Sequence, residues 1–318
     1  MFVDNHCHLS MEHSRKEADR LARELPLGVY CLMSTSYFDL DTVHDIMLSS
    51  DSVVPYYGVH PWYSHLFRVS AGTKAEHYNR VLQPAPSSEL LDVLPEPFDF
   101  YEFLGRIREC AEVCKAKGRK YGIGELGLDK LFRVPTNGFY GNQEITENVR
   151  LSNSKVTMDH QLHIYTEQLK LANELNVPVS LHCVKAHGAF FDSLAKSSAY
   201  DSIPAVILHS YTGSIEQAQS WVKEYRKKPT KLLFSFSNYI NAAEQKLPTL
   251  YNVLDILDDS QILLETDMPI DRFFLSDKDG EYAEHAEGIT SAVCSHRGWS
   301  ADNAQELLYN NSINIYNV

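Results

Sequence analysis

The sequence has few basic residues, few cysteines and no long apolar stretch. Its 318 residues include 29 Lys and Arg against 42 Asp and Glu. The formal net charge of −13 excludes a protein that binds nucleic acid over its whole surface. Six cysteines are too few for the disulfide framework of a small secreted domain. Since no window approaches eighteen apolar residues and the first ten residues do not resemble a signal peptide, we expect no membrane partner and a cytoplasmic location, with a nuclear one as an addition.

A glycine-rich phosphate loop is also missing. The segment after the first apolar run reads NHCHLS, where a doubly wound nucleotide-binding sheet would carry its glycines. The sequence instead alternates short apolar runs with amphipathic helical stretches. The apolar runs cover residues 1–4, 28–34, 53–59, 121–126, 177–181, 205–208, 231–236 and 261–265, and the helical stretches include 12–24, 39–48, 101–117, 155–176, 215–225 and 250–257. Eight apolar strands followed by helices predict a TIM-type (β/α)8 barrel, with residues 1–318 as a single domain.

Two connections are much longer than an ordinary barrel loop. They cover residues 61–99 and 130–156, and each follows a predicted strand. Segments that follow barrel strands lie on the face where active sites are built, so these insertions could shape a substrate mouth or a lid. The alternative is that both are surface excursions without a role.

Metal-binding residue types stand at the ends of the predicted strands. His6 and His8 form an H-x-H pair, and alternation along a strand places both imidazoles on one face. Fourteen histidines in 318 residues give about 0.6 such pairs by chance, so the pair alone means little. The full set is His6, His8, Glu125, His182, His209 and Asp267. In a barrel these six side chains would converge, and six ligands are too many for one tetrahedral site but suit two divalent metals.

Six segments in a characteristic order carry a resemblance to a known family. They are DNHCHL from Asp4, GVHP from Gly58, GELGLD from Gly124, the helix and strand that end at His182, HSYTGS from His209 and LLETDMP from Leu263. This ordered set resembles the TatD-related metal-dependent deoxyribonucleases, within the amidohydrolase-like metal-dependent hydrolases. The resemblance covers most of the chain.

The resemblance implies a ligand set and a reaction. His6, His8, Glu125 and Asp267 would hold one metal, while Glu125, His182 and His209 would hold the second, so that Glu125 bridges them. The family uses Mg²⁺ or Mn²⁺, and Zn²⁺ is an alternative. A hydroxide bridged by the two metals would attack phosphorus, with Glu125 and Asp267 as the catalytic residues. Asp267 would act either as the general base or as a ligand only.

The same resemblance indicates the substrate. The implied activity is cleavage of phosphodiester bonds in DNA, as a 3′ to 5′ exodeoxyribonuclease acting on strand ends. His60 and Lys185 are the candidates for holding the substrate phosphate, although His60 could fix a loop and Lys185 could be a solvated residue. Alternatives are hydrolysis of RNA or of an amide or ester, and a barrel kept as a scaffold that binds a protein partner through its long loops.

Some residues depart from the family pattern or carry weaker expectations. Family members often have arginine where Lys185 stands, and lysine cannot make a two-pronged phosphate contact. Asp129 is expected to orient a metal-binding histidine, and Asp4 either to do the same or to cap a turn. His160 is expected to face solvent at the start of its helix.

Overall fold

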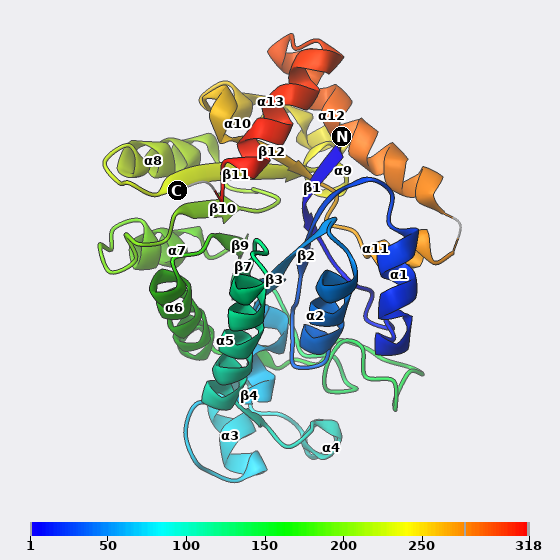
Figure 1. Ribbon diagram of the computed structural model, residues 1–318. Coiled ribbons are helices and arrows are strands. Elements are labelled where there is room, and N and C mark those ends of the chain that lie inside the picture. Colours follow the sequence, from blue (N-terminus) through cyan, green and yellow to red (C-terminus); the bar gives the residue numbers. More distant parts are fainter. Residues whose placement is uncertain (1, 277, 317–318) are drawn as a thin grey trace.

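The computed structural model describes residues 2–276 and 278–316, and its centre is a barrel of parallel strands (Figure 1). Eight strands form one sheet in the order β1-β2-β3-β7-β9-β10-β11-β12. They are β1 (Phe2–Cys7), β2 (Gly28–Met33), β3 (Val53–Tyr57), β7 (Gly122–Asp129), β9 (Val179–Val184), β10 (Ala205–Leu208), β11 (Lys231–Ser237) and β12 (Ile262–Glu265). The predicted (β/α)8 barrel is therefore confirmed, and each predicted apolar run corresponds to one of these strands. Met1, in the first run, lies outside the described residues.

The barrel closes through the ends of its first and last strands. The Asp267 backbone N–H donates to the His6 carbonyl at 2.9 Å, and the His8 N–H donates to the Met268 carbonyl at 2.9 Å. An isolated parallel bridge joins His8 to Pro269. These bonds hold the segment that carries His6 and His8 next to the segment that carries Asp267.

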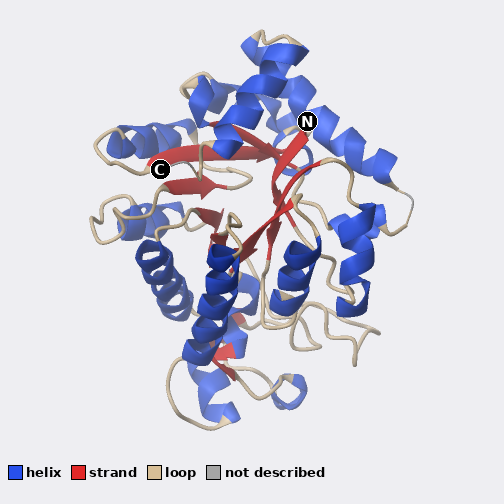
Figure 2. Cartoon of the chain, viewed as in Figure 1, coloured by secondary structure: helices blue, strands red, loops and turns tan. Residues whose placement is uncertain are grey.

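Helices surround the barrel and cover its outer face (Figure 2). The α-helices are α1 (Ala18–Glu24), α2 (Leu40–Ser49), α3 (Lys74–Val81), α4 (Ser88–Val93), α5 (Phe100–Ala116), α6 (Met158–Leu175), α7 (His187–Leu194), α8 (Ile215–Tyr225), α9 (Asn238–Asn241), α10 (Leu247–Leu254), α11 (Ile270–Phe274), α12 (Asp279–Arg297) and α13 (Ala301–Ile313). Short 3-10 helices are η1 (Arg15–Glu17), η2 (Pro61–Leu66), η3 (Glu244–Lys246) and η4 (Asp259–Gln261). In α6, Tyr165, Leu169 and Ala172 recur at the spacing of one helix face, and all three are buried.

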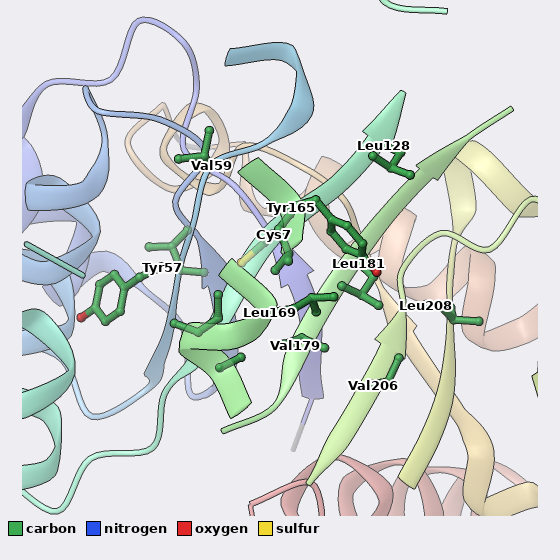
Figure 3. Close-up of a cluster of buried hydrophobic side chains, with 14 of the residues drawn as sticks. Cys7, Tyr57, Val59, Leu128, Tyr165, Leu169, Val179, Leu181, Val206 and Leu208 are labelled. Carbon is green, nitrogen blue, oxygen red and sulfur yellow. The ribbon is translucent and has the colours of Figure 1, made fainter. Parts of the chain in front are cut away.

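Two separate apolar layers follow from the alternation of side chains along each strand. One lies between strands and helices, where Leu169 and Tyr165 of α6 pack near Val179 and Leu181 of β9 (Figure 3). The other lies inside the barrel and comprises Cys31, Met33, Val54, Tyr56, Ala205, Ile207, Leu233, Leu263 and Ile315. The barrel is thus a packed core, and its interior side chains continue into the site described below.

The two long connections brace each other. The 61–99 segment contains η2, β4 (Phe67–Arg68), α3, β5 (Leu82–Gln83), α4 and β6 (Phe98–Asp99), while the 130–156 segment ends in β8 (Lys155–Val156). Strand β5 pairs with β8 in an antiparallel arrangement, and β4 pairs with β6 in parallel. Figure 1 shows α3 and α4 grouped beyond the end of α5.

Three buried histidines anchor these segments. The Nε2 of His65 donates to the Gly138 carbonyl at 2.9 Å, that of His77 to the His65 carbonyl at 2.8 Å, and that of His160 to the Ser64 carbonyl at 2.9 Å. The expectation that His160 faces solvent is wrong, since the 61–99 segment covers it. Within the part of the chain that the structure describes, the helices are too short or too polar to cross a bilayer.

Candidate metal centre

The structure brings all six predicted metal-binding side chains together at the carboxyl end of the barrel. His6 lies in β1, Glu125 in β7 and His182 in β9, while His209 follows β10 directly. His8 and Asp267 lie just past β1 and β12, where the barrel closes. They meet because parallel strands all present their carboxyl ends on the same side.

Glu125 lies in the middle of this cluster and is only 2 % exposed. Its Oε2 is 3.2 Å from the Nε2 of His6 and 3.3 Å from the Nε2 of His8. Its Oε1 is 2.8 Å from the Nδ1 of His182 and 3.0 Å from the Nε2 of His209. The two carboxylate oxygens therefore face two different imidazole pairs.

Within each pair, two ring nitrogens also face one another. The Nε2 atoms of His6 and His8 are 3.1 Å apart, and the Nδ1 of His182 is 3.4 Å from the Nε2 of His209. Nitrogen lone pairs that converge beside a carboxylate oxygen form a donor set for a cation. The Oδ1 of Asp267 lies 3.3 Å from the His8 Nε2 and extends the first set. Nitrogen and carboxylate donors of this kind fit divalent metal ions.

Both carboxylates of the centre are held in their charged form. Burial by itself favours the neutral acid, but the imidazoles that surround it hold the pKa of Glu125 well below its ordinary value. Burial opposes ionisation of Asp267 as well, and the adjacent His8 lowers its pKa. Two carboxylates that stay ionised in a buried site are ready to bind cations.

A second layer of polar groups orients the imidazoles. The Nδ1 of His6 lies 2.8 Å from the Oγ of Ser180, and the Nδ1 of His209 lies 3.1 Å from the Oε1 of Glu265. Glu265 is fully buried, and its Oε1 also accepts hydrogen bonds from the backbone N–H and hydroxyl of Ser210 at 2.8 and 2.7 Å. Glu265 was not predicted from the sequence, because its role depends on a contact with His209, which follows a different strand.

The two aspartates expected near the centre behave differently. The Oδ2 of Asp129 accepts a hydrogen bond from the Trp62 indole at 2.7 Å and lies 3.5 Å from the Nε2 of His182, so the expected orienting role stays a prediction. Asp4 instead accepts hydrogen bonds from the Thr266 backbone and hydroxyl at 2.9 and 2.5 Å, and from Tyr282. It therefore ties β1 to the end of β12 and contacts no metal-binding imidazole through these bonds.

The two candidates for phosphate binding are placed differently. His60 is buried, and its Nε2 lies 3.4 Å from the Oε1 of Glu125. Its Nδ1 accepts a hydrogen bond from the Trp62 backbone N–H at 3.1 Å, so the proton of the neutral ring is on Nε2. Burial lowers the pKa of His60 to about 4, which keeps the ring neutral. Lys185 is exposed just after β9, one residue beyond the cavity-lining Val184.

Backbone strain is concentrated at this end of the barrel. Lys185, Ser210 and Asp267 have positive φ angles of 54°, 37° and 59°, and each lies just past a strand. Residues other than glycine adopt this left-handed conformation at a cost of order 1–3 kcal/mol, and such residues cluster at functional sites. The turns after β9, β10 and β12 are therefore held by the surrounding structure in conformations that aim their side chains.

A cavity of about 1030 Å³ opens over the metal centre. Its wall includes five of the six metal-binding candidates, all but His6, together with His60. Both long connections contribute: residues 92–95 of the first and 139–144 of the second lie in the wall. These segments therefore shape the mouth of the site, which was one of the two expectations for them.

A barrel that gathers histidines and carboxylates at the carboxyl ends of its strands is the architecture of metal-dependent hydrolases. A sequence model described as "TatD related DNase" matches residues 3–317. The chain belongs to this family of deoxyribonucleases, which are hydrolases acting on ester bonds.

Curated relatives and a solved structure agree with this assignment. The "Uncharacterized deoxyribonuclease YMR262W" of Saccharomyces cerevisiae is 36 % identical over 76 % of this chain and 75 % of its own length. The "Cut9-interacting protein scn1" of Schizosaccharomyces pombe is 28 % identical over 83 % and 86 % of the two chains. A "3'-5' ssDNA/RNA exonuclease TatD" from Cronobacter sakazakii is 33 % identical over 36 % of this chain and 40 % of its own. The crystal structure of YJJV, a TatD homolog from Escherichia coli K12, has a TM-score of 0.61 at 18 % identity over 100 % and 98 % of the chains and supports the fold.

Proposed function

We propose that the chain is a metal-dependent deoxyribonuclease that removes nucleotides from the 3′ end of a DNA strand. The observation that carries the proposal is that the two carboxylate oxygens of Glu125 face separate pairs of converging imidazole nitrogens. This arrangement suits two cations that share one carboxylate. The exonuclease named among the relatives supports the 3′ to 5′ direction.

Two divalent ions would be held by the side chains that the sequence indicated. His6, His8, Glu125 and Asp267 would hold one, and Glu125, His182 and His209 the other. Mg²⁺ or Mn²⁺ is the expected ion, and Zn²⁺ is the alternative because imidazoles suit it. When bound, such ions supply Lewis-acid activation of water and of the phosphodiester.

The protein side chains would move protons and hold the substrate. Asp267, with its side chain 23 % exposed and its carboxylate ionised, would take the proton of the attacking water or act as a ligand only. The Nε2–H of His60 points into the centre and can donate to a phosphate oxygen. Lys185 would reach the phosphate from the rim, where its exposed side chain keeps its freedom to move.

A labelled-strand assay tests the function. Purified protein with Mg²⁺ or Mn²⁺ should shorten a 5′-labelled single strand from its 3′ end, leave a circular single strand intact, and lose activity with a chelator. Asp267→Ala should abolish the reaction. Asp267→Asn keeps an oxygen ligand but cannot take a proton, so retained metal affinity with a lost kcat would assign the general-base role. A wild-type protein that leaves DNA intact with Mg²⁺, Mn²⁺ and Zn²⁺ would refute the proposal.

Parallel substrates separate the alternatives. RNA, small phosphodiesters, carboxylic esters and amides can be offered to the same metal-loaded protein. Hydrolysis of RNA in preference to DNA, or of an ester or amide only, would change the proposed substrate but not the proposed metal ligands.

A protein partner is a second candidate role, compatible with the first. The 130–156 connection exposes Leu131, Ile145, Val149 and Leu151, and exposed apolar side chains of this kind occur in contact surfaces. A relative of this chain is named for its interaction with Cut9. If the connection binds a partner, the double variant Leu131→Ser and Leu151→Ser should lose the partner in a pull-down while nuclease activity persists.

Two expectations from the sequence stay predictions. The cytoplasmic location, with a nuclear one in addition, is supported by the six cysteines, all of which are free thiols. Fractionation of cells that express the tagged chain would test it. The assignment of residues 1–318 to a single domain would be tested by whether the chain unfolds in one cooperative transition.

A further inference from the structure

A row of aromatic rings lines the cavity and leads away from the metal centre. The Trp62 ring centroid lies 6.4 Å from that of His182 and 5.4 Å from that of Tyr140. Phe139, the neighbour of Tyr140 in the chain, stacks on Phe38 with centroids 4.8 Å apart and planes within 11°. Trp62, Tyr140, Phe139 and Phe38, called the aromatic row below, all lie in the cavity wall.

Neighbouring side chains hold the rings of the aromatic row in place. The Trp62 indole donates to Asp129, and its ring stacks on Phe132 at 5.7 Å with planes within 15°. Phe38 packs edge-on against Phe98 at 5.7 Å, and Phe98 stacks on Tyr37 at 3.9 Å. Phe38 nevertheless stays 42 % exposed. Rings that are fixed on one side and open on the other provide a stacking surface at little entropic cost.

The charges around the row do not attract phosphates. Beyond the metal centre the wall contains the carboxylates of Asp39, Asp92 and Glu144. Its arginine, Arg272, is engaged by Glu12 at 2.5 Å. A duplex is bound mainly by neutralising its phosphates with Lys and Arg, and this wall offers little of that. This charge distribution favours binding of the adjoining nucleotides through their bases.

We propose that the aromatic row stacks against the unpaired bases that adjoin the scissile phosphodiester, and that it restricts the enzyme to frayed or single-stranded ends. Bases in a duplex stack on each other and cannot offer a face to these rings, whereas every unpaired base has one. The inference rests on the proposed nuclease function and adds the residues that select the strand. It also reconciles an acidic protein with a nucleic-acid substrate.

The experiment combines a side-chain deletion with a base deletion. Phe38→Ala is compared with wild type on a single-stranded tetranucleotide, on the same strand with an abasic nucleotide at each position in turn, and on methyl p-nitrophenyl phosphate. Stacking on an aromatic ring contributes about 5- to 150-fold per base. The variant should therefore lower kcat/KM for the normal strand by about that factor more than for the small ester. At the abasic position that removes the stacked base, the variant should cause no additional loss.

Two further variants give controls. Phe38→Trp restores a stacking face and should recover the activity on the normal strand. Tyr101→Ala removes a ring that is 48 % exposed on α5 and does not line the cavity, so both substrates should be cleaved as by wild type.

The outcomes distinguish this inference from the proposed function. Equal losses on the normal strand, on every abasic strand and on the small ester would mean that Phe38 only supports its loop, and the inference would be wrong. A wild-type protein that cleaves neither strand nor small ester would refute the function instead. Binding of a labelled tetranucleotide in Ca²⁺, measured by fluorescence anisotropy, applies the same comparison without turnover, and unchanged affinity in Phe38→Ala would overturn the inference on its own.

Discussion

The two ends of the barrel interior use the same strands for opposite purposes. On β10 the inward side chains pass from Ile207 to His209, and on β12 they pass from Leu263 to Glu265. On each strand, a side chain of the apolar interior is only two residues away from a side chain of the candidate metal centre. The amino-terminal side is closed by the apolar layer inside the barrel, called the plug below, while the carboxyl-terminal side holds the charged and titratable side chains.

This difference shows how the fold tolerates a polar interior. The plug supplies burial, since its members are at most 8 % exposed. The centre buries carboxylates and imidazoles, which costs desolvation free energy. Bound cations would offset this cost. We therefore expect changes at the plug to affect stability and changes at the centre to affect activity.

The largest effect is expected for Glu125→Gln. The amide keeps the shape of the side chain but removes the charge shared by both imidazole pairs, so several kcal/mol of transition-state stabilisation should be lost, about 10³-fold or more in kcat/KM. Steady-state kinetics on single-stranded DNA measure this. Mn²⁺ should raise the Tm of wild type and not that of the variant. If Mn²⁺ protects both proteins equally, Glu125 is not a shared ligand.

The counterpart at the plug is Ile207→Ala. Removing the buried side chain should lower the free energy of unfolding by about 2–5 kcal/mol, because it leaves a cavity that the barrel cannot fill. Urea titration followed by circular dichroism measures this. At urea concentrations below the unfolding transition, the kcat/KM of the variant should stay within a few-fold of that of wild type. A loss as large as that of Glu125→Gln would break the division between the two ends.

Acid sensitivity should come from the connections beyond the carboxyl-terminal side, where His65 lies in η2, and not from the apolar interior. Burial lowers the pKa of His65 to about 4, below the 6.5 of the unfolded chain. The unfolded state therefore takes up the proton first, so stability is full above pH 6.5 and is lost as the pH falls toward 4, by at most about 3 kcal/mol for this residue. His65→Gln should flatten the stability curve of the metal-free protein over this range.

The plug variant provides the comparison for that curve. Ile207→Ala contains no altered titratable group, so its stability should run parallel to wild type from pH 8 to pH 4. If His65→Gln also runs parallel, the imidazole of His65 does not titrate with unfolding in this range.

The smallest effect is expected for Asp129→Asn. This change weakens the acceptor of the Trp62 indole and the partner of His182, without removing a metal ligand. Residues that orient metal ligands typically contribute 10–100-fold to metal affinity or activity. Metal titration by calorimetry and kcat/KM should both shift by that amount. If neither shifts, the Asp129 carboxylate only supports the loop.

Much of the site could be predicted because its signals are local in the sequence. His182 follows a buried run, and Asp267 follows another, so strand polarity alone places both at one end of the barrel. The burial of His160 could not be predicted in this way, because it depends on the 61–99 connection folding back over α6. The orienting role of Glu265 likewise emerges only from a tertiary contact.

The sequence by itself determined the eight strands, the barrel and the six side chains that converge on its carboxyl end. It could do so because side-chain alternation and parallel strand direction are properties of the backbone, which the apolar pattern reveals. Only the tertiary structure decided which oxygen of Glu125 faces which imidazoles, and that Phe38, Trp62, Phe139 and Tyr140 form one row. These relations join residues far apart in the chain, and their distances are set by packing of the long connections.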